Sequence, residues 1–255
     1  MFKNSSIKQL NAMDKKIGDV MTSRIFLLSL IILITIPSIY QIVELSQGRG
    51  MLSTYAPWRG WIAVITMSLA NPLIVLSSTR MGRKNRKFYG PSLGMNLLRV
   101  FYFLMLALWY QVLRVLIIIF LVTKSFVQWD KNKKGETVKS LDPLIVVMLL
   151  SGIVIIGLSM GYLMSLVPES SKWANPTPYL DSFGVLLIIT GVYLLTSHYK
   201  QAFIFFYISK VIMSIMFISL GQWSSLVTIV AFAFIIDPMS LMTWEIRWRK
   251  QQLVK

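Results

Sequence analysis

The stretch QAFIFFYISKVIMSIMF, Gln201 to Phe217, decides the fold, because it is almost unbroken hydrocarbon with Lys210 at its centre. The rest of the chain has the same character. Of its 255 residues, 55% are hydrophobic and only 14% are charged, and the mean hydropathy is +0.65. This composition is too apolar for an ordinary soluble domain and indicates a membrane protein.

The positive charge of the chain lies between the apolar runs. The chain has 26 Lys and Arg against 10 Asp and Glu, a formal net charge of +16. Clusters such as Gly82 to Lys87 and Asp130 to Lys134 lie in loops, as is typical of segments beside anionic lipid on the cytoplasmic side. This placement argues against a nucleic-acid partner. The absence of cysteine excludes disulfides and thiol chemistry.

Eight apolar runs have the length of about 20 residues that a hydrocarbon core about 30 Å thick requires of a helix. The run from Tyr89 to Trp129 is too long for one span. Trp109 and Tyr110 near its middle predict a turn at the membrane interface. The predicted spans are Ile25 to Glu44, Trp61 to Ser78, Tyr89 to Leu108, Gln111 to Trp129, Pro143 to Val167, Leu180 to Ser197, Ala202 to Leu220 and Trp223 to Trp244.

The basic segments alternate with the predicted spans and set the orientation of the chain. Arg80 to Lys87, Lys124 to Lys139, His198 to Lys200 and Arg247 to Lys255 fall on one side of an eight-span arrangement, together with the amino-terminal tail. Basic loops are retained on the cytoplasmic side. We therefore predict a multi-pass protein of the plasma membrane with both termini in the cytoplasm. The polar start of the chain is too long and too mixed for a signal peptide, so we expect it to be retained.

Two three-helix units are predicted after the first span. Trp109 and Trp129 bound the last helix of the first unit, Trp223 and Trp244 bound that of the second, and each unit ends on a basic segment. A single span between them would give both units the same orientation, so we expect a parallel repeat of three plus one plus three helices. Chance similarity among apolar segments is the alternative. The expected divisions are residues 1–24 (cytoplasmic tail), 25–59 (extra helix and loop), 60–129 (first repeat), 130–178 (linker helix), 179–246 (second repeat) and 247–255 (cytoplasmic tail).

A family resemblance lies in the segment TPYLDSFGVLLIITGVYLLTSHYKQAFIFFYISKVIMSIMFISLGQWSS, Thr177 to Ser225. It resembles the PnuC family of vitamin transporters, whose best-known members carry nicotinamide riboside. Members begin the fifth core helix with Pro-x-x-Asp-Ser, matched here by Pro178, Asp181 and Ser182. Their sixth core helix has the pattern E-x-W-x-x-W-x-x-x-N, which this chain keeps in spacing only. The corresponding positions hold Gln201, Phe203, Phe206 and Lys210.

The likeness extends more weakly from about Gly60 to Trp244 and leaves the first helix outside the family core. It implies an all-α, SWEET-like fold and a homotrimer. It also implies facilitated diffusion of the substrate, which is trapped in the cell when a kinase phosphorylates it.

The sequence also predicts an aromatic face that could hold a flat ring. Phe203, Phe206 and Lys210 are spaced three and four residues apart, so they share one face of a helix. Stacking of a base on an aromatic side chain is worth about 1 to 3 kcal/mol. The alternative is that the two phenylalanines only pack against lipid or a neighbouring helix.

Charged residues inside the spans indicate a polar interior. A charge near the bilayer centre costs about 2.5 to 3.5 kcal/mol, so Lys210 is expected to face inward and to pair with Asp181 or Asp237. Asn96 and Arg99 place polar groups on the matching helix of the first repeat. A buried ion pair that only supports helix packing is the alternative. The predicted substrate-binding residues are Phe203, Phe206, Lys210, Asp181, Asn96, Arg99 and Asp237.

The motifs favour transport over catalysis. The chain lacks G-x-x-x-x-G-K-[ST] and any clustered histidines or paired carboxylates, so we predict no enzyme, no catalytic residue, no metal and no cofactor. Nicotinamide riboside and thiamine are cationic, and an uncompensated Lys210 would repel either by about 4 kcal/mol at 4 Å. We therefore expect a neutral nucleoside or deoxynucleoside ahead of nicotinamide riboside or another vitamin. A membrane scaffold that does not transport is the other class of function left open.

Overall fold

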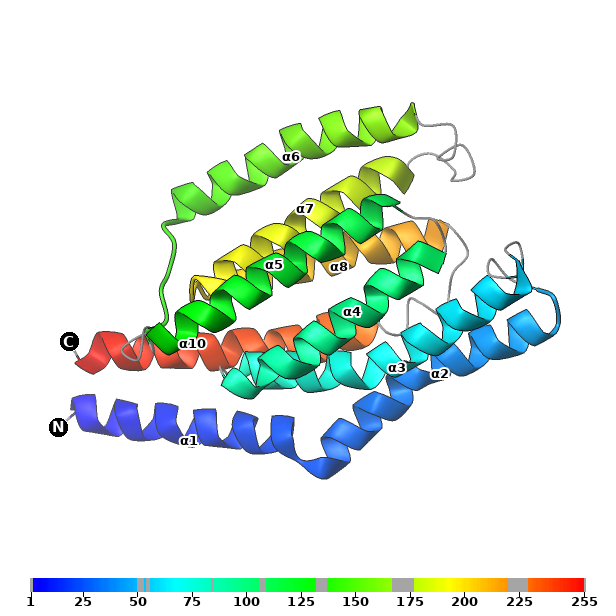
Figure 1. The fold of residues 1–255 in the computed structure, drawn as a ribbon. Coiled ribbons are helices and arrows are strands. Elements are labelled where there is room, and N and C mark those ends of the chain that lie inside the picture. Colours follow the sequence, from blue (N-terminus) through cyan, green and yellow to red (C-terminus); the bar gives the residue numbers. More distant parts are fainter. Residues whose placement is uncertain are drawn as a thin grey trace.

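The computed structural model describes residues 2–49, 53, 56–83, 85–105, 109–131, 137–166, 177–219 and 229–254. Throughout these ranges the regular structure is helical apart from an isolated β-bridge between Lys139 and Tyr199, so the all-α prediction is confirmed (Figure 1). In chain order the helices are α1 (Phe2–Thr22), α2 (Arg24–Ser46), α3 (Pro57–Gly82), the 3-10 turn η2 (Arg86–Phe88), α4 (Tyr89–Met105), α5 (Trp109–Lys131), α6 (Pro143–Ser165), α7 (Thr177–Thr196), α8 (Ala202–Ser219), the π-helical turn η4 (Phe232–Ile236) and α10 (Asp237–Val254).

Each of the predicted spans coincides with a helix, apart from residues 106–108, 167, 220 and 223–228, which lie outside the described ranges. Within those ranges, five helices are long and apolar enough to cross a membrane. They are Arg24–Ser46, Pro57–Gly82, Pro143–Ser165, Pro178–Thr196 and Ile229–Val254. Ala202–Met216 is a shorter apolar helix. The count of eight spans is a prediction that these helices leave open.

The helices form a bundle in which most helices that follow one another in the sequence also pack side by side (Figure 1). Helix α4 lies between α3 and α5, and α7 lies between α6 and α8. Helix α5 packs on α7, and α10 packs on both α3 and α8, which closes the bundle. Six helices thereby surround one interior, while α6 stands at the edge against α7 and α2 stands outside against α3. The arrangement of two three-helix units around a linker helix, and the repeat relationship between them, are still predictions.

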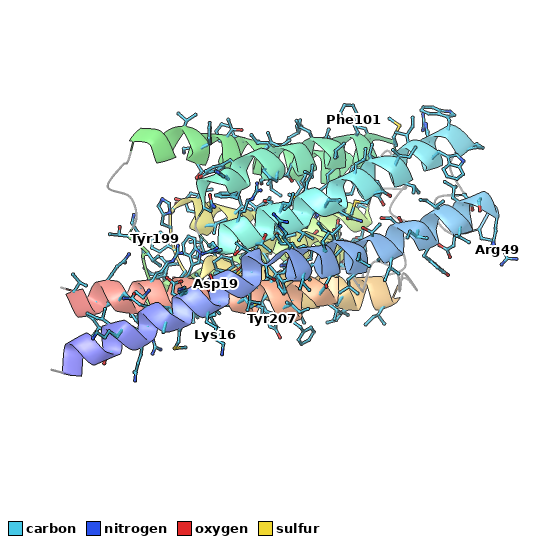
Figure 2. The ribbon with its side chains drawn as sticks, turned by 90° about the horizontal axis from the view of Figure 1, so that it is seen from below. Lys16, Asp19, Arg49, Phe101, Tyr199 and Tyr207 are labelled. Carbon is cyan, nitrogen blue, oxygen red and sulfur yellow. The ribbon has the colours of Figure 1, made fainter. Side chains whose placement is uncertain are left out.

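The outer surface of the bundle is apolar. Large hydrophobic side chains are exposed on several helices, such as Ile155 (67%), Phe120 (65%) and Phe101 (54%). Figure 2 labels Phe101. Exposed apolar surface of this extent is typical of a face that contacts lipid. Helices suit that environment because they satisfy their backbone polar groups internally. Arg49, after α2, lies at one end of the molecule, and Lys16 lies on α1 in the other half (Figure 2).

Both predicted tails are helical. In α1 the partly buried residues Ile7, Leu10 and Ile17 and the buried Met21 follow a spacing of three, seven and four, which makes one apolar stripe on a polar helix. This stripe packs on α10, which continues past the predicted end of its span to Val254. The tail at the start of the chain was therefore too polar for a span but carried the period of a surface helix.

Local sequence sets the breaks between the helices. Ser23 separates α1 from α2, and its hydroxyl oxygen accepts a hydrogen bond from the Phe26 backbone N–H at 3.1 Å as the cap of α2. Asp142 caps α6 in the same way, accepting from the Leu144 N–H at 2.8 Å, with Pro143 at the first helical position.

Candidate functional site

Lys210 projects from the middle of α8 toward α10, where its ammonium group bonds to the Asp237 carboxylate. This is one of the two partners predicted for it, and the pairing is confirmed. The Lys210 side chain keeps 22% of its surface exposed, whereas that of Asp237 keeps 4%. The pair is therefore buried on the aspartate side and accessible on the lysine side.

The π-helical turn η4 presents Asp237. The Asp237 backbone N–H bonds to the carbonyl of Phe232, five residues back, in place of the usual four. Pro238 follows and has no N–H to donate, so the regular ladder is interrupted at this point of the helix. Turns of this kind inside α-helices occur often at functional positions.

Two aromatic rings flank the ammonium group of Lys210. Its Nζ lies 5.1 Å from the centroid of the Phe232 ring and 5.9 Å from that of Phe206. Both distances are within the range of a cation–π contact. Phe206 thus lies next to Lys210, as the spacing on α8 predicted.

Phe203 lies deeper in the bundle. Its side chain is 1% exposed and packs edge-on against Phe206, at 6.0 Å between ring centroids, and against Trp244 of α10 at 5.5 Å. Packing against a neighbouring helix is the alternative that the sequence left open for Phe203 and Phe206. A role for Phe203 in binding a substrate ring is still a prediction.

Asp181 on α7 belongs to a second polar group rather than to Lys210. Its two carboxylate oxygens accept hydrogen bonds from the Gln111 Nε2 on α5, at 2.7 and 2.5 Å. Arg114, one turn further along α5 and 7% exposed, attracts the Asp181 charge and lies with its guanidinium carbon 5.4 Å from the Phe103 ring centroid.

Asn96 and Arg99 bring α4 to the same interior. Asn96 is 1% exposed and donates from Nδ2 to the carbonyl oxygen of Ser92 at 2.8 Å. The Arg99 charge is repelled by both Arg114 and Lys210. We call Arg99, Arg114, Asp181, Lys210 and Asp237 the central charge cluster.

Sequence reasoning missed the part played by Gln111, Arg114 and Phe232. Gln111 was predicted only as the first residue of a span, and neither Arg114 nor Phe232 was among the predicted substrate-binding residues. The sequence did contain a signal for Gln111 and Arg114. They are three residues apart and so share one face of α5, as Asn96 and Arg99 do on α4.

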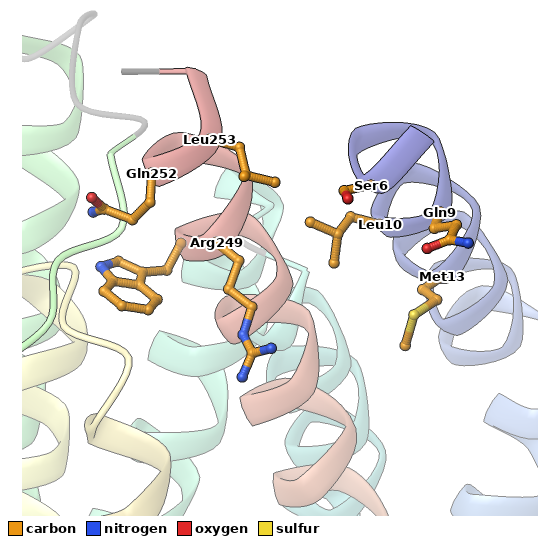
Figure 3. A pocket seen from close by; sticks show the side chains of 8 residues that line it. Ser6, Gln9, Leu10, Met13, Arg249, Gln252 and Leu253 are labelled. Atoms are coloured by element: carbon orange, nitrogen blue, oxygen red, sulfur yellow. The ribbon is translucent and has the colours of Figure 1, made fainter. Parts of the chain in front are cut away.

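A separate pocket lies between α1 and α10, with a volume of about 520 Å³ (Figure 3). Leu10 and Met13 of α1 face Arg249 and Leu253 of α10 across it (Figure 3). None of the predicted site residues lines this pocket. Among the described residues, no group of three or more His, Cys, Asp or Glu side chains is placed to hold a metal ion.

Comparison with known proteins decides the family. Residues 58–246 match the family described as nicotinamide mononucleotide transporter. The chain belongs to this family. The resemblance seen in the sequence is confirmed, and α1 and α2 lie outside the matched residues. Members of the family are membrane transporters, in agreement with a multi-pass protein that is not an enzyme.

The fold of the family is also found in a solved structure, the crystal structure of the vitamin B3 transporter PnuC. The two structures superimpose with a TM-score of 0.60, over 89% of this chain and 93% of the other, at 14% sequence identity. At this identity the likeness concerns the fold alone. No curated protein matches the chain.

Proposed function

We propose that this protein carries a vitamin B3-like compound across the membrane, with nicotinamide riboside as the first candidate. The observation that carries the proposal is the ion pair between Lys210 and Asp237 inside a bundle of the transporter family. A cation inside a span is expected to face a bundle interior or a wet cavity. The Lys210 side chain keeps 22% of its surface exposed.

The ion pair removes the reason for preferring a neutral nucleoside. That preference depended on Lys210 acting as an uncompensated positive charge that repels a pyridinium ring. Asp237 lies against the ammonium group and compensates it, so the pair presents no net charge to a cationic ring. A vitamin of the kind named for the family and its fold then becomes the better candidate.

The groups around the pair suit a flat, charged ring. Phe206 and Phe232 offer aromatic faces beside Lys210, and the Asp237 carboxylate would attract a pyridinium. We propose passive equilibration of the compound through rocking of the two halves about this midplane site. A homotrimeric assembly, a plasma-membrane location and cytoplasmic termini belong to the same proposal, as suggested by the family resemblance and the basic segments.

Uptake into liposomes that contain only the purified protein tests this function. We expect labelled nicotinamide riboside to equilibrate across the bilayer without ATP or an ion gradient. Asp237→Asn should lower the initial rate by about tenfold or more, because Lys210 would then face the cationic ring uncompensated. Asp19→Asn, on the exposed face of α1, is the matched control and should leave the rate unchanged.

Two results would contradict the proposal. The first is an absence of flux for nicotinamide riboside and for other vitamins. The second is faster flux for neutral nucleosides than for nicotinamide riboside in the wild-type protein.

A further inference from the structure

Three side chains surround the ammonium group of Lys210. The Asp237 carboxylate bonds to it, and the ring centroids of Phe232 and Phe206 lie 5.1 and 5.9 Å from its Nζ. We call Asp237, Phe232 and Phe206 the cation cage. Aromatic rings placed around a positive charge are a common means by which proteins bind organic cations. The chain thus contains such a cage, and one of its own side chains occupies it.

Access to the cation cage depends on Lys210. The three members of the cage are buried, with 4% of Asp237, 5% of Phe232 and 8% of Phe206 exposed, whereas the Lys210 side chain keeps 22%. A compound can therefore reach the Asp237 carboxylate only if the Lys210 side chain moves aside. Lysine is suited to this movement, because its ammonium group is carried on a long flexible stem.

A second lysine shows the same arrangement with closer contacts. The Lys200 Nζ bonds to the Glu245 Oε2 at 2.6 Å and lies 3.5 Å from the centroid of the Trp248 ring. In the cation cage the nearer centroid is 5.1 Å away, so the Lys210 ammonium group gains less from the aromatic faces than Lys200 does. A flat cationic ring can stack on an aromatic face and use it more fully. Such a ring can therefore replace the Lys210 ammonium group.

We propose that Lys210 is a built-in competitor of the substrate: its ammonium group occupies the place of the cationic ring, and the ring displaces it from Asp237 on binding. This inference rests on the proposed function, since it concerns the same site and a cationic substrate. One cation replaces another, so the net charge of the cage and its occupant is unchanged. Lys210 is then a specificity-determining residue, because it excludes every cation that binds the cage less well than its own ammonium group.

Calorimetry on the purified full-length protein tests the inference with one matched pair of compounds. Nicotinamide riboside has a cationic pyridinium ring, and its reduced dihydropyridine form has the same ribose and carboxamide on an uncharged ring. We expect Lys210→Gln to bind nicotinamide riboside about tenfold more tightly than the wild type does, because the competitor is gone and the Asp237 carboxylate is unpaired. The affinity for the reduced form should change by less than about threefold.

Lys200→Gln is the matched control. It makes the same change in an ion pair with an aromatic neighbour outside the cation cage and should leave both affinities at the wild-type values. Chemical rescue gives a second readout. Lys210→Ala removes the atoms that propylammonium supplies, so this ion should raise the melting temperature of Lys210→Ala and leave that of the wild type unchanged. An absence of rescue would count against a cage that accepts free cations.

The double variant Lys210→Met with Asp237→Leu keeps the test decisive even if Lys210→Gln does not fold. It lacks both the competitor and the carboxylate, so its affinity for the cationic form relative to the uncharged form should fall about tenfold below the wild-type ratio. An unchanged ratio in either variant, or weaker binding of nicotinamide riboside to Lys210→Gln, would overturn the inference and leave the proposed vitamin transport standing. If the wild type neither bound nor transported either form, the inference and the proposed function would both fail.

Discussion

Lys210 and Asp237 depend on each other, because neither charge is stable alone inside the bundle. Taking an ammonium and a carboxylate out of water costs several kcal/mol for each ion, and their mutual attraction offsets this only when both are present. Asp237 is 4% exposed, so it has little water to replace a lost partner. The pair therefore couples α8 to α10 through an interaction that is lost when either charge is removed.

Removal of one partner should destabilise the protein more than removal of both. We expect Lys210→Met or Asp237→Leu alone to lower the free energy of unfolding by about 3–5 kcal/mol, because an uncompensated buried charge is left behind. The double variant should recover most of this loss. Thermal or denaturant unfolding of the purified protein in detergent measures the cycle. Additive single effects would show that the two charges are not coupled.

The sequence predicted part of this cluster because a charge in an apolar run is conspicuous. Lys210 and Asp237 stand within long hydrophobic stretches, so Lys210 was predicted to face inward and to pair with Asp181 or Asp237. Asp181 was predicted as a site residue, but its bond to Gln111 was not, because a glutamine beside Trp109 and Tyr110 also fits a membrane interface. Which polar groups meet depends on how each helix is rotated about its own axis, and the amino-acid sequence alone does not specify this rotation.

At the scale of elements, glycine decides how closely α6 approaches α7. A Cβ atom at Gly161 would lie 2.4 Å from the Tyr179 ring and 2.9 Å from the Tyr179 Cα, and one at Gly157 would lie 2.5 Å from the Phe183 ring. At Gly152 on the same helix nothing lies within 4 Å. Small residues at a contact let two membrane helices approach closely, and here they attach an edge helix to the bundle.

Alanine at these positions separates packing from helix propensity. We expect Gly161→Ala to lower the free energy of unfolding by about 1–3 kcal/mol, because the backbone of α7 cannot move aside as a side chain could. Gly152→Ala should be neutral or stabilising by up to about 1 kcal/mol, since alanine is the better helix former. Thermal unfolding of both variants measures the difference. Equal effects at the two positions would mean that α6 does not pack on α7 through this face.

The lengths of apolar runs predicted the helices of the core well, because a span needs about 20 apolar residues. The same criterion could not find α1 or the end of α10. Both are polar and pack on each other, and the signal in α1 is the spacing of Ile7, Leu10, Ile17 and Met21 rather than hydropathy. At the scale of elements, the sequence thus predicts the helices that need a long apolar run to cross the bilayer. It does not predict by the same criterion the helices that pack on the bundle through tertiary contact.

At the scale of the whole molecule, the bundle carries an added structure at the end where α1 meets the far end of α10. Asp14 takes a place in the apolar stripe of α1 and bonds to Lys250 at 3.1 Å, with Arg247 at 3.7 Å. Arg83 at the end of α3 donates to the Thr22 hydroxyl at 3.2 Å. Helix α1 lies outside the family match, so the family core does not require it.

The attachment of α1 should therefore be weak and sensitive to salt. The side chains of Asp14, Arg247 and Lys250 are each 20–27% exposed, and ion pairs near water contribute about 0–1 kcal/mol apiece. We expect Asp14→Asn to speed tryptic cleavage after Lys15 and Lys16 by about fivefold, the effect of about 1 kcal/mol on local opening. Raised ionic strength should act on the wild type in the same direction.

The matched control for this prediction is Asp19→Asn, which makes the same chemical change on the exposed face of α1 and should leave cleavage at the wild-type rate. Vitamin uptake and the melting temperature of the core should change little in Asp14→Asn, because the central charge cluster and the packing of Phe203 on Trp244 do not involve α1. Unchanged cleavage would show that the apolar stripe alone holds the helix. A parallel loss of uptake would instead make α1 part of the transporting unit, since release of the helix would then disturb α10 as far as Asp237.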